Sequence, residues 1–543
     1  MVPDLVLFNA DICTMDALTP RAQALAVTKG RVSALGDSVD IRALAGTATR
    51  MIDADGRLVL PGFQDTHIHL LNGGYAYNSV AILHDCRSIV DLQRVLRTFA
   101  ASHPEGWVRG TGWQPGIFTQ TPLDRHIIDA AVPDRPCLII DCNVHSACLN
   151  TKGCEAVGLV SGLADPPNGH FVFDETGAPT GMLHEDAIEW ALERMPKPTD
   201  EDYANGVCHA QALCHRHGIT GVLDASVADL HNRVYRRLEN AGELTLRIAA
   251  TARVDPSEAT LDALERIDEM RRQYRSEQFR VHSAKFFIDG IFENRTAAML
   301  APYSDGDSGN APLMFDPEQI RELFVAFDAA RFQIHTHVIG DRAVRAALDG
   351  LGAARLANGY WPSLHQLAHV QVVDPSDFPR FRSLGAMANI QPLWARQDPT
   401  LADMVTPMIG NERGRWIYPF RSLIDAGASY CLSSDWSVST LNPFPIIETA
   451  IARAPSRRMQ QGPAFLPEQR MTRLECVAGY TIHAAAAAWR SQDTGSLSVG
   501  KSADLIVLDR DIFTCDIQDI SETEVLLTVL AGRDVYRAEN FAG

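Results

Sequence analysis

Apolar residues in the second half of the chain recur first at helical and then at strand spacing. Leu261, Leu264, Ile267 and Met270 lie three residues apart, which places them on one helix face, and the apolar run 279–288 predicts a strand. The same alternation predicts helices over 320–327, 343–356, 374–384 and 421–426, and strands over 332–338, 366–371, 386–391 and 428–433. Repeated strand–helix units with short turns predict an α/β fold, a (β/α)8 TIM-like barrel.

Both ends of the chain contain short β runs instead. These runs are residues 5–8, 24–27, 31–35 and 50–52 near the N-terminus, and 505–508, 525–529 and 535–536 near the C-terminus. Neither group is large enough for an independent sandwich. We therefore expect one small β-sandwich domain, built from residues 1–60 plus 490–543, beside a barrel of residues 61–489.

The region from about 70 to 230 has a less regular pattern. Strands are predicted over 107–112 and 137–141, and helices over 185–194 and 202–217. We expect early barrel strands that carry large insertions, because insertions at the carboxyl end of barrel strands usually shape a pocket.

Composition narrows the classes of function. The 543 residues carry a net charge of −18, which argues against binding nucleic acid or an anionic membrane through bulk electrostatics. No apolar run reaches the length of a membrane span, and Asp4 and Asp11 interrupt the segment where a signal peptide would be apolar. The 11 cysteines form no Cys-x-x-Cys pair, which is typical of reduced thiols. A cytoplasmic protein is expected.

A His-x-His pattern follows a Pro-Gly break at Pro61-Gly62. Residues two apart on a strand point to the same face, so His67 and His69 can bind one metal ion together. Two ordinary histidines among the 18 in the chain would give the same pattern.

Other polar residues lie late in, or directly after, the later predicted strands: Lys285, His337, His369 and Asp435. In a barrel these strand ends surround one opening, so all six side chains are predicted to meet there. Each alone also fits an ordinary role, such as a snorkelling lysine or a helix-capping residue. Six suitable residues at strand ends favour a shared metal site.

The motifs that carry these residues resemble the amidohydrolase superfamily, and most of all its YtcJ-like branch, which includes N-substituted formamide deformylases. The matching motifs are Pro61-Gly-Phe-Gln-Asp-Thr-His-Ile-His69, Lys285-Phe-Phe-Ile-Asp-Gly290, Arg295-Thr-Ala297, His337-Val-Ile-Gly-Asp-Arg-Ala343, Ala368-His369, Ser434-Asp-Trp436, Gly495 to Leu508 and Ala531-Gly-Arg-Asp-Val-Tyr536. The resemblance therefore spans nearly the whole chain.

This resemblance implies a divalent-metal centre. His67, His69 and Asp435 would hold one ion and His337 and His369 the other, with Lys285 bridging them as a carbamate formed with carbon dioxide. Charge supports the carbamate, because hydroxide, carbamate and Asp435 reduce the +4 of two ions to about +1. With a single ion, Lys285 would stay unmodified. Zinc suits these ligands, while manganese, iron or cobalt also fit.

The implied activity is hydrolysis of a non-peptide carbon–nitrogen bond in a small amide, formamide or cyclic amide. Metal-activated hydroxide attacks the carbonyl, and Asp435 acts as general base and then acid. Asp435, Lys285 and His337 are the predicted catalytic residues. The family also implies a homodimer.

Seven residues are candidates for substrate contact: Trp113, His145, Asn150, Glu185, Asp289, Arg295 and Trp394. Packing or local hydrogen bonding would explain each equally well. Two features depart from the branch: Ile291-Phe-Glu-Asn294 replaces small residues, and Ser437 stands where proline is common.

Two rival functions are considered. A mononuclear deaminase acting on an amino-heterocycle usually has a glutamate shortly after the third metal histidine. Here Val338-Ile-Gly-Asp341 follows His337, so amide hydrolysis is favoured and Asp341 leaves the question open. A non-catalytic scaffold is disfavoured because all six ligand residues are present.

Overall fold

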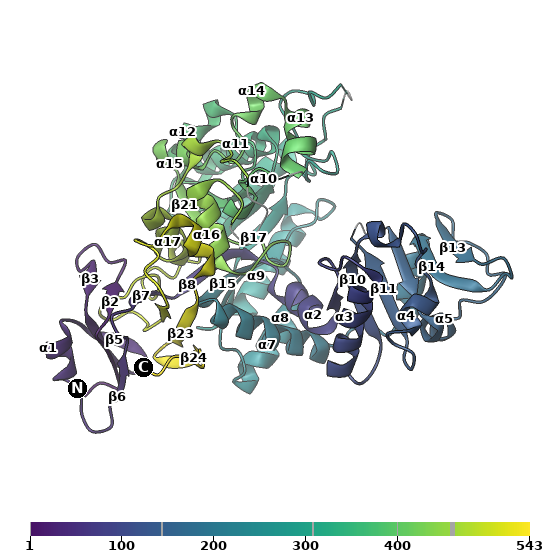
Figure 1. Cartoon of the computed structure of the whole chain (residues 1–543). Coiled ribbons are helices and arrows are strands. Elements are labelled where there is room, and N and C mark those ends of the chain that lie inside the picture. Colours follow the sequence, from purple (N-terminus) through teal and green to yellow (C-terminus); the bar gives the residue numbers. More distant parts are fainter. Residues whose placement is uncertain (1, 143–144, 307–308, 399, 457–461) are drawn as a thin grey trace. The chain divides into compact units, whose positions relative to one another are not determined.

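The computed structural model describes residues 2–142, 145–306, 309–398, 400–456 and 462–543 (Figure 1). These residues form two compact units. The first combines residues 1–70 with 211–543, and the second comprises residues 71–210. Each unit is described by itself below.

An eight-stranded parallel barrel forms the centre of the first unit. Its strands are, in spatial order, β8 (Phe63–Ile68), β15 (Ile219–Val227), β16 (Arg247–Arg253), β17 (Phe279–Phe287), β18 (Gln333–Val338), β19 (Gln366–His369), β20 (Met387–Ile390) and β21 (Ser429–Leu432). The two end strands come together where Thr66 Oγ1 on β8 donates a hydrogen bond of 2.8 Å to the Leu432 carbonyl on β21. The predicted TIM-like barrel is confirmed.

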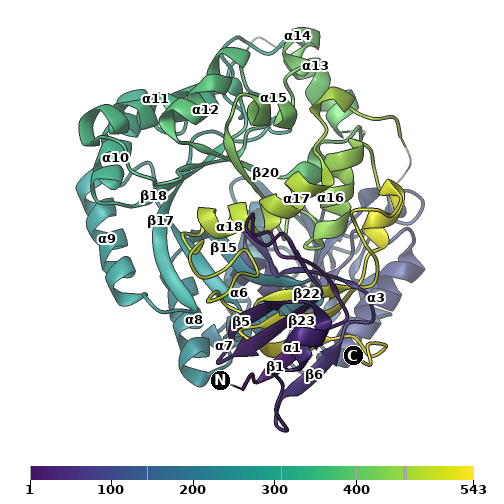
Figure 2. The same cartoon turned by 90° about the vertical axis from the view of Figure 1, so that its left-hand side faces the viewer.

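Helices follow most of the barrel strands, and Figure 2 shows α8 to α12 around the outside of the barrel. The main helices of this unit are α8 (Asp229–Ala241), α9 (Thr260–Gln273), α10 (Pro317–Ala329), α11 (Asp341–Asn358), α12 (Phe378–Leu384), α15 (Phe420–Asp425), α16 (Pro443–Ala452), α17 (Arg473–Tyr480) and α18 (Ile482–Ala487). Helix α10 begins with proline at its first position, where the missing N–H costs no hydrogen bond. Its buried face includes Phe324, whose ring centroid lies 5.2 Å from that of Phe286 on β17. This contact anchors the strand that carries Lys285.

Strands from both termini pair in the same sheet. One sheet has the order β5 (Arg31–Gly36), β4 (Ala24–Thr28), β1 (Leu5–Phe8) and β6 (Arg50–Asp53). The other has the order β24 (Arg533–Arg537), β23 (Val525–Leu530), β22 (Leu505–Leu508), β7 (Leu58–Pro61), β2 (Asp11–Cys13) and β3 (Arg21–Ala22). Within it, β7 is antiparallel to β22 and parallel to β2. The domain limits at 60 and 490 stay a prediction.

The second unit has a sheet of its own. The sheet order is β13 (Gly169–Phe173), β14 (Pro179–Glu185), β12 (Ser146–Leu149), β11 (Cys137–Asp141), β10 (Val108–Trp113) and β9 (Ala81–Ile82). The helices of this region are α2 (Leu70–Ser79), α3 (Ile89–Ser102), α4 (Arg125–Asp129), α5 (Thr151–Val157), α6 (Asp186–Arg194) and α7 (Asp200–Arg216).

The strands expected at 107–112 and 137–141 therefore exist, but the expectation that they belong to the barrel is wrong. The reason is that β11 pairs antiparallel with β12, the next strand along the chain. A barrel in which every strand is parallel cannot include such a pair.

All 11 cysteines are free thiols, and most of them are buried. Among the described residues, no helix combines the length and the apolar character that crossing a bilayer requires.

A buried ion pair connects barrel strand β16 with the sheet built from both termini. Arg247, at the start of β16, contacts the Asp504 carboxylate just before β22, and their side chains are 8% and 5% exposed. Arg247 also donates to Ser502 Oγ at 2.9 Å, and Asp504 accepts the Ala531 N–H at 2.8 Å. Removing one partner leaves the other charge buried and uncompensated.

Asp504→Ala is therefore expected to lower the free energy of unfolding by about 3–5 kcal/mol. Urea unfolding followed by circular dichroism measures this change. Asp11→Ala, which breaks the half-exposed Arg21–Asp11 pair, is the matched control and is expected to cost less than about 1 kcal/mol. Equal effects of the two substitutions would contradict a structural role for the buried pair.

Candidate metal centre and substrate cavity

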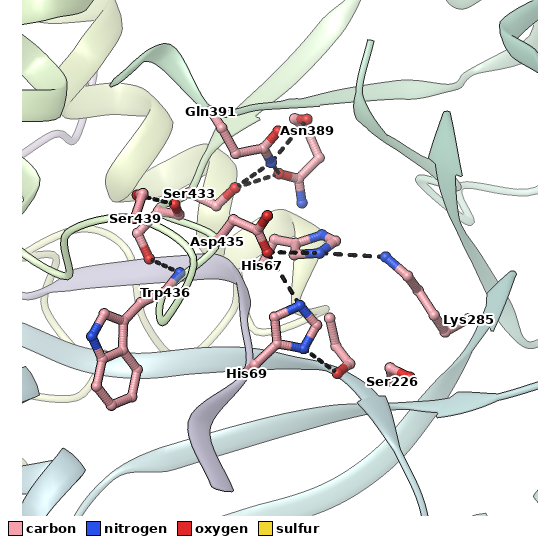
Figure 3. A network of polar contacts seen from close by, with 12 residues as sticks. His67, His69, Ser226, Lys285, Asn389, Gln391, Ser433, Asp435, Trp436 and Ser439 are labelled. Carbon is pink, nitrogen blue, oxygen red and sulfur yellow. Dashed lines mark hydrogen bonds and ion pairs between the residues drawn. The ribbon is translucent and has the colours of Figure 1, made fainter. Parts of the chain in front are cut away.

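The six predicted ligand residues lie at the carboxyl end of the barrel. His67 is on β8, Lys285 on β17, His337 on β18, and His369 ends β19. His69 directly follows β8, and Asp435 lies shortly after β21. Figure 3 shows His67, His69 and Asp435 facing one another, with the amino group of Lys285 directed toward them.

Short distances connect four of these side chains. Asp435 Oδ1 lies 3.2 Å from His69 Nε2 and 3.5 Å from His67 Nε2, and Lys285 Nζ lies 3.3 Å from His67 Nε2. Ligand atoms of His67, His369 and Asp435 lie within 4.8 Å of one another, which is close enough to share one cation. Imidazole nitrogens and a carboxylate oxygen are donors that zinc and related divalent ions prefer.

Backbone geometry brings Asp435 to the two histidines of β8. The Asp435 N–H donates to the His67 carbonyl at 2.8 Å, and the His69 N–H donates to the Trp436 carbonyl at 2.7 Å. Asp435 has φ 58° and His369 has φ 78°, so both residues occupy the left-handed region that side chains other than glycine rarely adopt. Such backbone strain is concentrated at functional sites.

Burial lowers the pKa of three imidazoles of this centre, whereas the Asp435 carboxylate raises that of His69. Burial and then the neighbouring Lys285 lower the pKa of His67 well below its usual value and that of His337 to about 3. Burial likewise lowers the pKa of His369, whose Nδ1 is buried and has no hydrogen-bond partner among the described residues. A neutral imidazole with a free, buried nitrogen is suited to a metal ion. The residues present therefore fit a divalent cation.

His337 is oriented differently from the other ligand candidates. Its Nε2 lies 3.2 Å from the Gly290 carbonyl, while its ring centroid is 4.4 Å from that of His369. His337 thus connects the centre with the loop that follows β17.

A buried polar network supports the centre from the barrel interior (Figure 3). Asn389 Nδ2 on β20 donates to the Thr66 carbonyl at 2.9 Å, and Ser433 Oγ donates to Asn389 Oδ1 at 2.7 Å. Gln391 Nε2 donates to Ser433 Oγ at 2.7 Å. These bonds hold β8 against the strands that precede Asp435, and the sequence analysis did not identify these residues.

His335 is a further residue that the sequence analysis missed. It is fully buried, and its Nε2 lies 2.9 Å from His67 Nδ1. When His67 uses Nε2 for a metal ion, its Nδ1 carries the proton and donates it to His335, which fixes the ring orientation. The available signal was a second His-x-His pattern, His335-Thr-His337, on one strand.

His335→Leu is expected to weaken metal binding by about 10- to 100-fold, because His67 loses its hydrogen-bond acceptor. Competition with a chelator measures the affinity. His335→Gln, which retains an acceptor atom, is the matched control and should weaken binding less. Unchanged affinity in His335→Leu would contradict this role.

A cavity of about 560 Å³ opens at the centre. It is lined by His67, His69, His337, His369 and Asp435 together with Phe287, Ile291, Glu293, Ile339, Gln371, Trp394, Arg396, Asp398, Thr400, Leu401, Val405, Tyr418 and Val438. Of the seven predicted substrate residues, Trp394 is in this lining, and its ring centroid lies 6.1 Å from that of His369.

Comparison with known proteins assigns this chain to a family. The model of the amidohydrolase family matches residues 50–536, which is most of the chain. The chain belongs to the amidohydrolase family.

Two full-length relatives place this amidohydrolase in the branch that its motifs predicted. It is 28% identical to the N-substituted formamide deformylase of Arthrobacter pascens, over 97% of this chain and 97% of that protein. It is 26% identical to the putative amidohydrolase YtcJ of Bacillus subtilis, over 97% of this chain and 98% of that protein. The resemblance to the YtcJ-like branch is confirmed.

A solved structure has the same fold. An uncharacterized metal-dependent hydrolase from Pyrococcus horikoshii OT3 superposes with a TM-score of 0.75 at 24% identity, covering 94% of this chain and 99% of that one.

Asp289 of the amidohydrolase has its carboxylate occupied by backbone groups. It accepts the N–H groups of Ile339, Gly340 and Ala298, each at 2.9 Å, and is fully buried. It therefore connects the loop after β17 with the turn after β18. Gly340 is required in that turn, because a Cβ there would lie 2.0 Å from the Ala298 carbonyl oxygen.

Arg295 forms an ion pair with Asp305 at 2.5 Å. Neither Arg295 nor Asp289 is among the described residues that line the cavity. Their contacts with substrate stay predictions. In the structure both residues have structural roles, Asp289 in bonding to backbone groups and Arg295 in its ion pair.

Four predicted substrate residues lie in the second unit. Trp113 is 4% exposed in a hydrophobic cluster, and Asn150 is the N-cap of α5, accepting the Gly153 N–H at 2.7 Å. His145 and Glu185 form an exposed pair with Nδ1 3.0 Å from the carboxylate, and this carboxylate raises the pKa of His145. Substrate contact by these residues stays a prediction.

Proposed function

We propose that this amidohydrolase is a metal-dependent enzyme that hydrolyses a non-peptide carbon–nitrogen bond in a small amide, formamide or cyclic amide. The observation that carries the proposal is the contact of buried Lys285 with His67, which together with Asp435 lines the cavity. The formamide-cleaving relative supports an amide substrate.

The proposed ligands are His67, His69 and Asp435 for one ion and His337 and His369 for another, with zinc as the preferred ion and manganese, iron or cobalt as alternatives. When bound, divalent ions lower the pKa of water and polarise a carbonyl group.

Lys285 is proposed to bridge the two ion sites as a carbamate. Burial lowers the pKa of its amino group to about 7, so neutral amine is present at neutral pH. The neutral nitrogen attacks the carbon of carbon dioxide, a C–N bond forms, and one proton leaves to solvent. The product is an anionic carbamate, whose two oxygens can bind metal ions where an ammonium group cannot.

Asp435 is proposed to transfer the proton of the reaction. Its Oδ1 lies at the cavity floor beside His67 and His69, where it can accept a proton from the attacking water and then donate it to the leaving nitrogen. His69 Nδ1 lies 3.1 Å from the Ala225 carbonyl and can donate its proton there, which leaves the Nε2 lone pair facing Asp435 as a ligand atom for the same ion.

The apolar part of the lining indicates the shape of the substrate. Phe287, Ile291, Leu401, Val405 and Val438 surround space that suits an alkyl or aryl substituent on the amide. We therefore expect N-substituted amides to be better substrates than unsubstituted ones.

The deaminase alternative is disfavoured by the position of Asp341. Its carboxylate accepts the Leu300 N–H at 2.7 Å, and Asp341 is not among the described residues lining the cavity. The scaffold alternative is disfavoured by the presence of all six ligand candidates at one opening.

Metal content per chain, measured together with intact mass under bicarbonate, tests the proposal. We expect two ions and a carbon dioxide adduct on Lys285, together with hydrolysis in a panel of formamides, acyl amides and cyclic amides. One ion, no adduct and turnover of amino-heterocycles alone would overturn it. A cytoplasmic location and a homodimer are also proposed, to be tested by cell fractionation and light scattering.

A further inference from the structure

Resting on the hydrolase proposed above, we infer that the cavity selects amides whose substituent ends in a positively charged group, and that Glu293 determines this selectivity. Glu293 lines the cavity and is exposed at its mouth. Its carboxylate makes no hydrogen bond or ion pair with another described residue, so it is available to a ligand.

The loop that carries Glu293 is held in place on both sides. The neighbouring Phe292 is fully buried, with its ring centroid 6.2 Å from that of Tyr303. The Gly290 N–H donates to the Thr296 carbonyl at 2.9 Å, and the Arg295 N–H donates to the Phe292 carbonyl at 2.8 Å. An exposed carboxylate is thus presented from a fixed backbone, which reduces the entropy lost when a ligand binds.

The remaining charges beside Glu293 leave this wall of the cavity negative. Asp398 and Arg396 lie 3.8 Å apart, and Arg396 also donates a hydrogen bond to the Leu393 carbonyl. Among the lining residues of this wall these two charges offset each other, and Glu293 adds a charge of −1. The Arg453 guanidinium is fully buried and outside the lining, where it donates to the Tyr418 carbonyl. A ligand cation neutralises the wall, whereas a ligand carboxylate would raise its charge to −2.

Tyr418 supplies an independent indication of a ligand here. Its side chain lines the cavity and the residue is only 5% exposed, yet its hydroxyl makes no hydrogen bond with another described residue. Its backbone is fixed, because its N–H donates to the Gln371 carbonyl at 2.7 Å and its carbonyl accepts from Arg453 at 3.1 Å. The hydroxyl oxygen can accept a hydrogen bond from an ammonium group, which has three donors and no acceptor.

Two further features favour a cation. Trp394 presents an aromatic ring in the same lining, and such a ring attracts a cation through its face. The net charge of −18 also favours the approach of cationic ligands over anionic ones. The Arg396 guanidinium also lines the cavity and could instead bind a substrate carboxylate, so preference for a carboxylate-bearing substrate is the competing outcome.

Three formamides with the same five-carbon spacer distinguish these outcomes: N-(5-aminopentyl)formamide, N-hexylformamide and 6-formamidohexanoate, which end in an ammonium, a methyl and a carboxylate group. We expect the holoenzyme to prefer the ammonium compound over the methyl compound by about fivefold in kcat/KM, the effect of one exposed charge pair. Glu293→Gln should abolish this preference, and Glu293→Lys should shift it to the carboxylate compound. Raising the salt concentration should reduce it.

Glu322→Gln is the matched control, because Glu322 is an exposed acid on the outer helix α10 and its loss changes net charge equally. Calorimetric titration of the uncleaved compounds into Asp435→Asn protein provides a readout that does not depend on turnover, and the same order of affinity is expected there.

A wild-type preference for the methyl or carboxylate compound would overturn the inference, as would an ammonium preference that survives Glu293→Gln. Failure of the proposed function is distinguishable from these results, since no formamide, acyl amide or cyclic amide of the full panel would then be hydrolysed. An order of affinity without the ammonium preference in the calorimetric titration would overturn the inference alone.

Discussion

Replacing Asp435 with asparagine is expected to lower kcat by about a thousandfold or more while leaving the fold intact. General acid–base catalysis by a positioned group contributes about 10²- to 10⁴-fold, and the carboxylate is also a proposed metal ligand. Among the described residues that line the cavity, Asp435 is the carboxylate within 3.5 Å of both His67 and His69.

The experiment compares kcat, metal content and thermal unfolding of wild-type and Asp435→Asn protein. Asp262→Asn, an exposed acid on α9, is the control for a general loss of charge. Restoring metal content by adding excess ion separates loss of the ligand from loss of the proton carrier. Near-normal turnover in a metal-loaded variant would refute the role of Asp435 as general base.

Replacing Lys285 with alanine is expected to have the second large effect, a loss of about 10²-fold or more in turnover with reduced metal content. The amino group lies 3.3 Å from His67 Nε2 and 5.0 Å from the Phe287 ring centroid, in a fully buried position. Removing a buried, poorly compensated amine should not weaken folding by more than the packing it contributes. The loss is therefore expected to be in catalysis.

A carbamate and an unmodified lysine differ in whether an added carboxylate can restore the activity of Lys285→Ala. If Lys285 bridges two ions as a carbamate, a small carboxylate such as propionate should enter the space left in Lys285→Ala and restore part of the activity. Lys285→Met, which fills that space with an apolar side chain, is the control and should not respond. Absence of rescue together with one metal ion per chain would favour an unmodified Lys285. It would also favour a deaminase that acts on amino-heterocycles.

The barrel and its opening were predictable from sequence because they depend on short-range rules. The run 279–288 and the helical spacing from Leu261 to Met270 reflect local periodicity, and the structure has β17 and α9 there. His67, Lys285, His369 and Asp435 were located by one topological rule, that the carboxyl ends of parallel strands surround one opening.

The sheet of the second unit could not be predicted from local periodicity. Strands β10 and β11 have the composition of barrel strands, and their membership of another sheet depends on the antiparallel pairing of β11 with β12. Strand β12 pairs in turn with β14, so the sheet that these strands join depends on a segment farther along the chain, and a single sequence does not display that pairing.

The sequence by itself determined the barrel and the set of metal-ligand candidates, since these follow from local periodicity and from residues at strand ends. The family followed from the resemblance of its motifs. The tertiary structure alone decided which polar side chains are free to act. Asp289 and Asn150 are engaged by backbone groups, whereas His335 contacts His67 and Glu293 faces the cavity. The physical reason is that a polar group is available for chemistry only when folding leaves it unsatisfied, and satisfaction depends on neighbours that are distant in the chain.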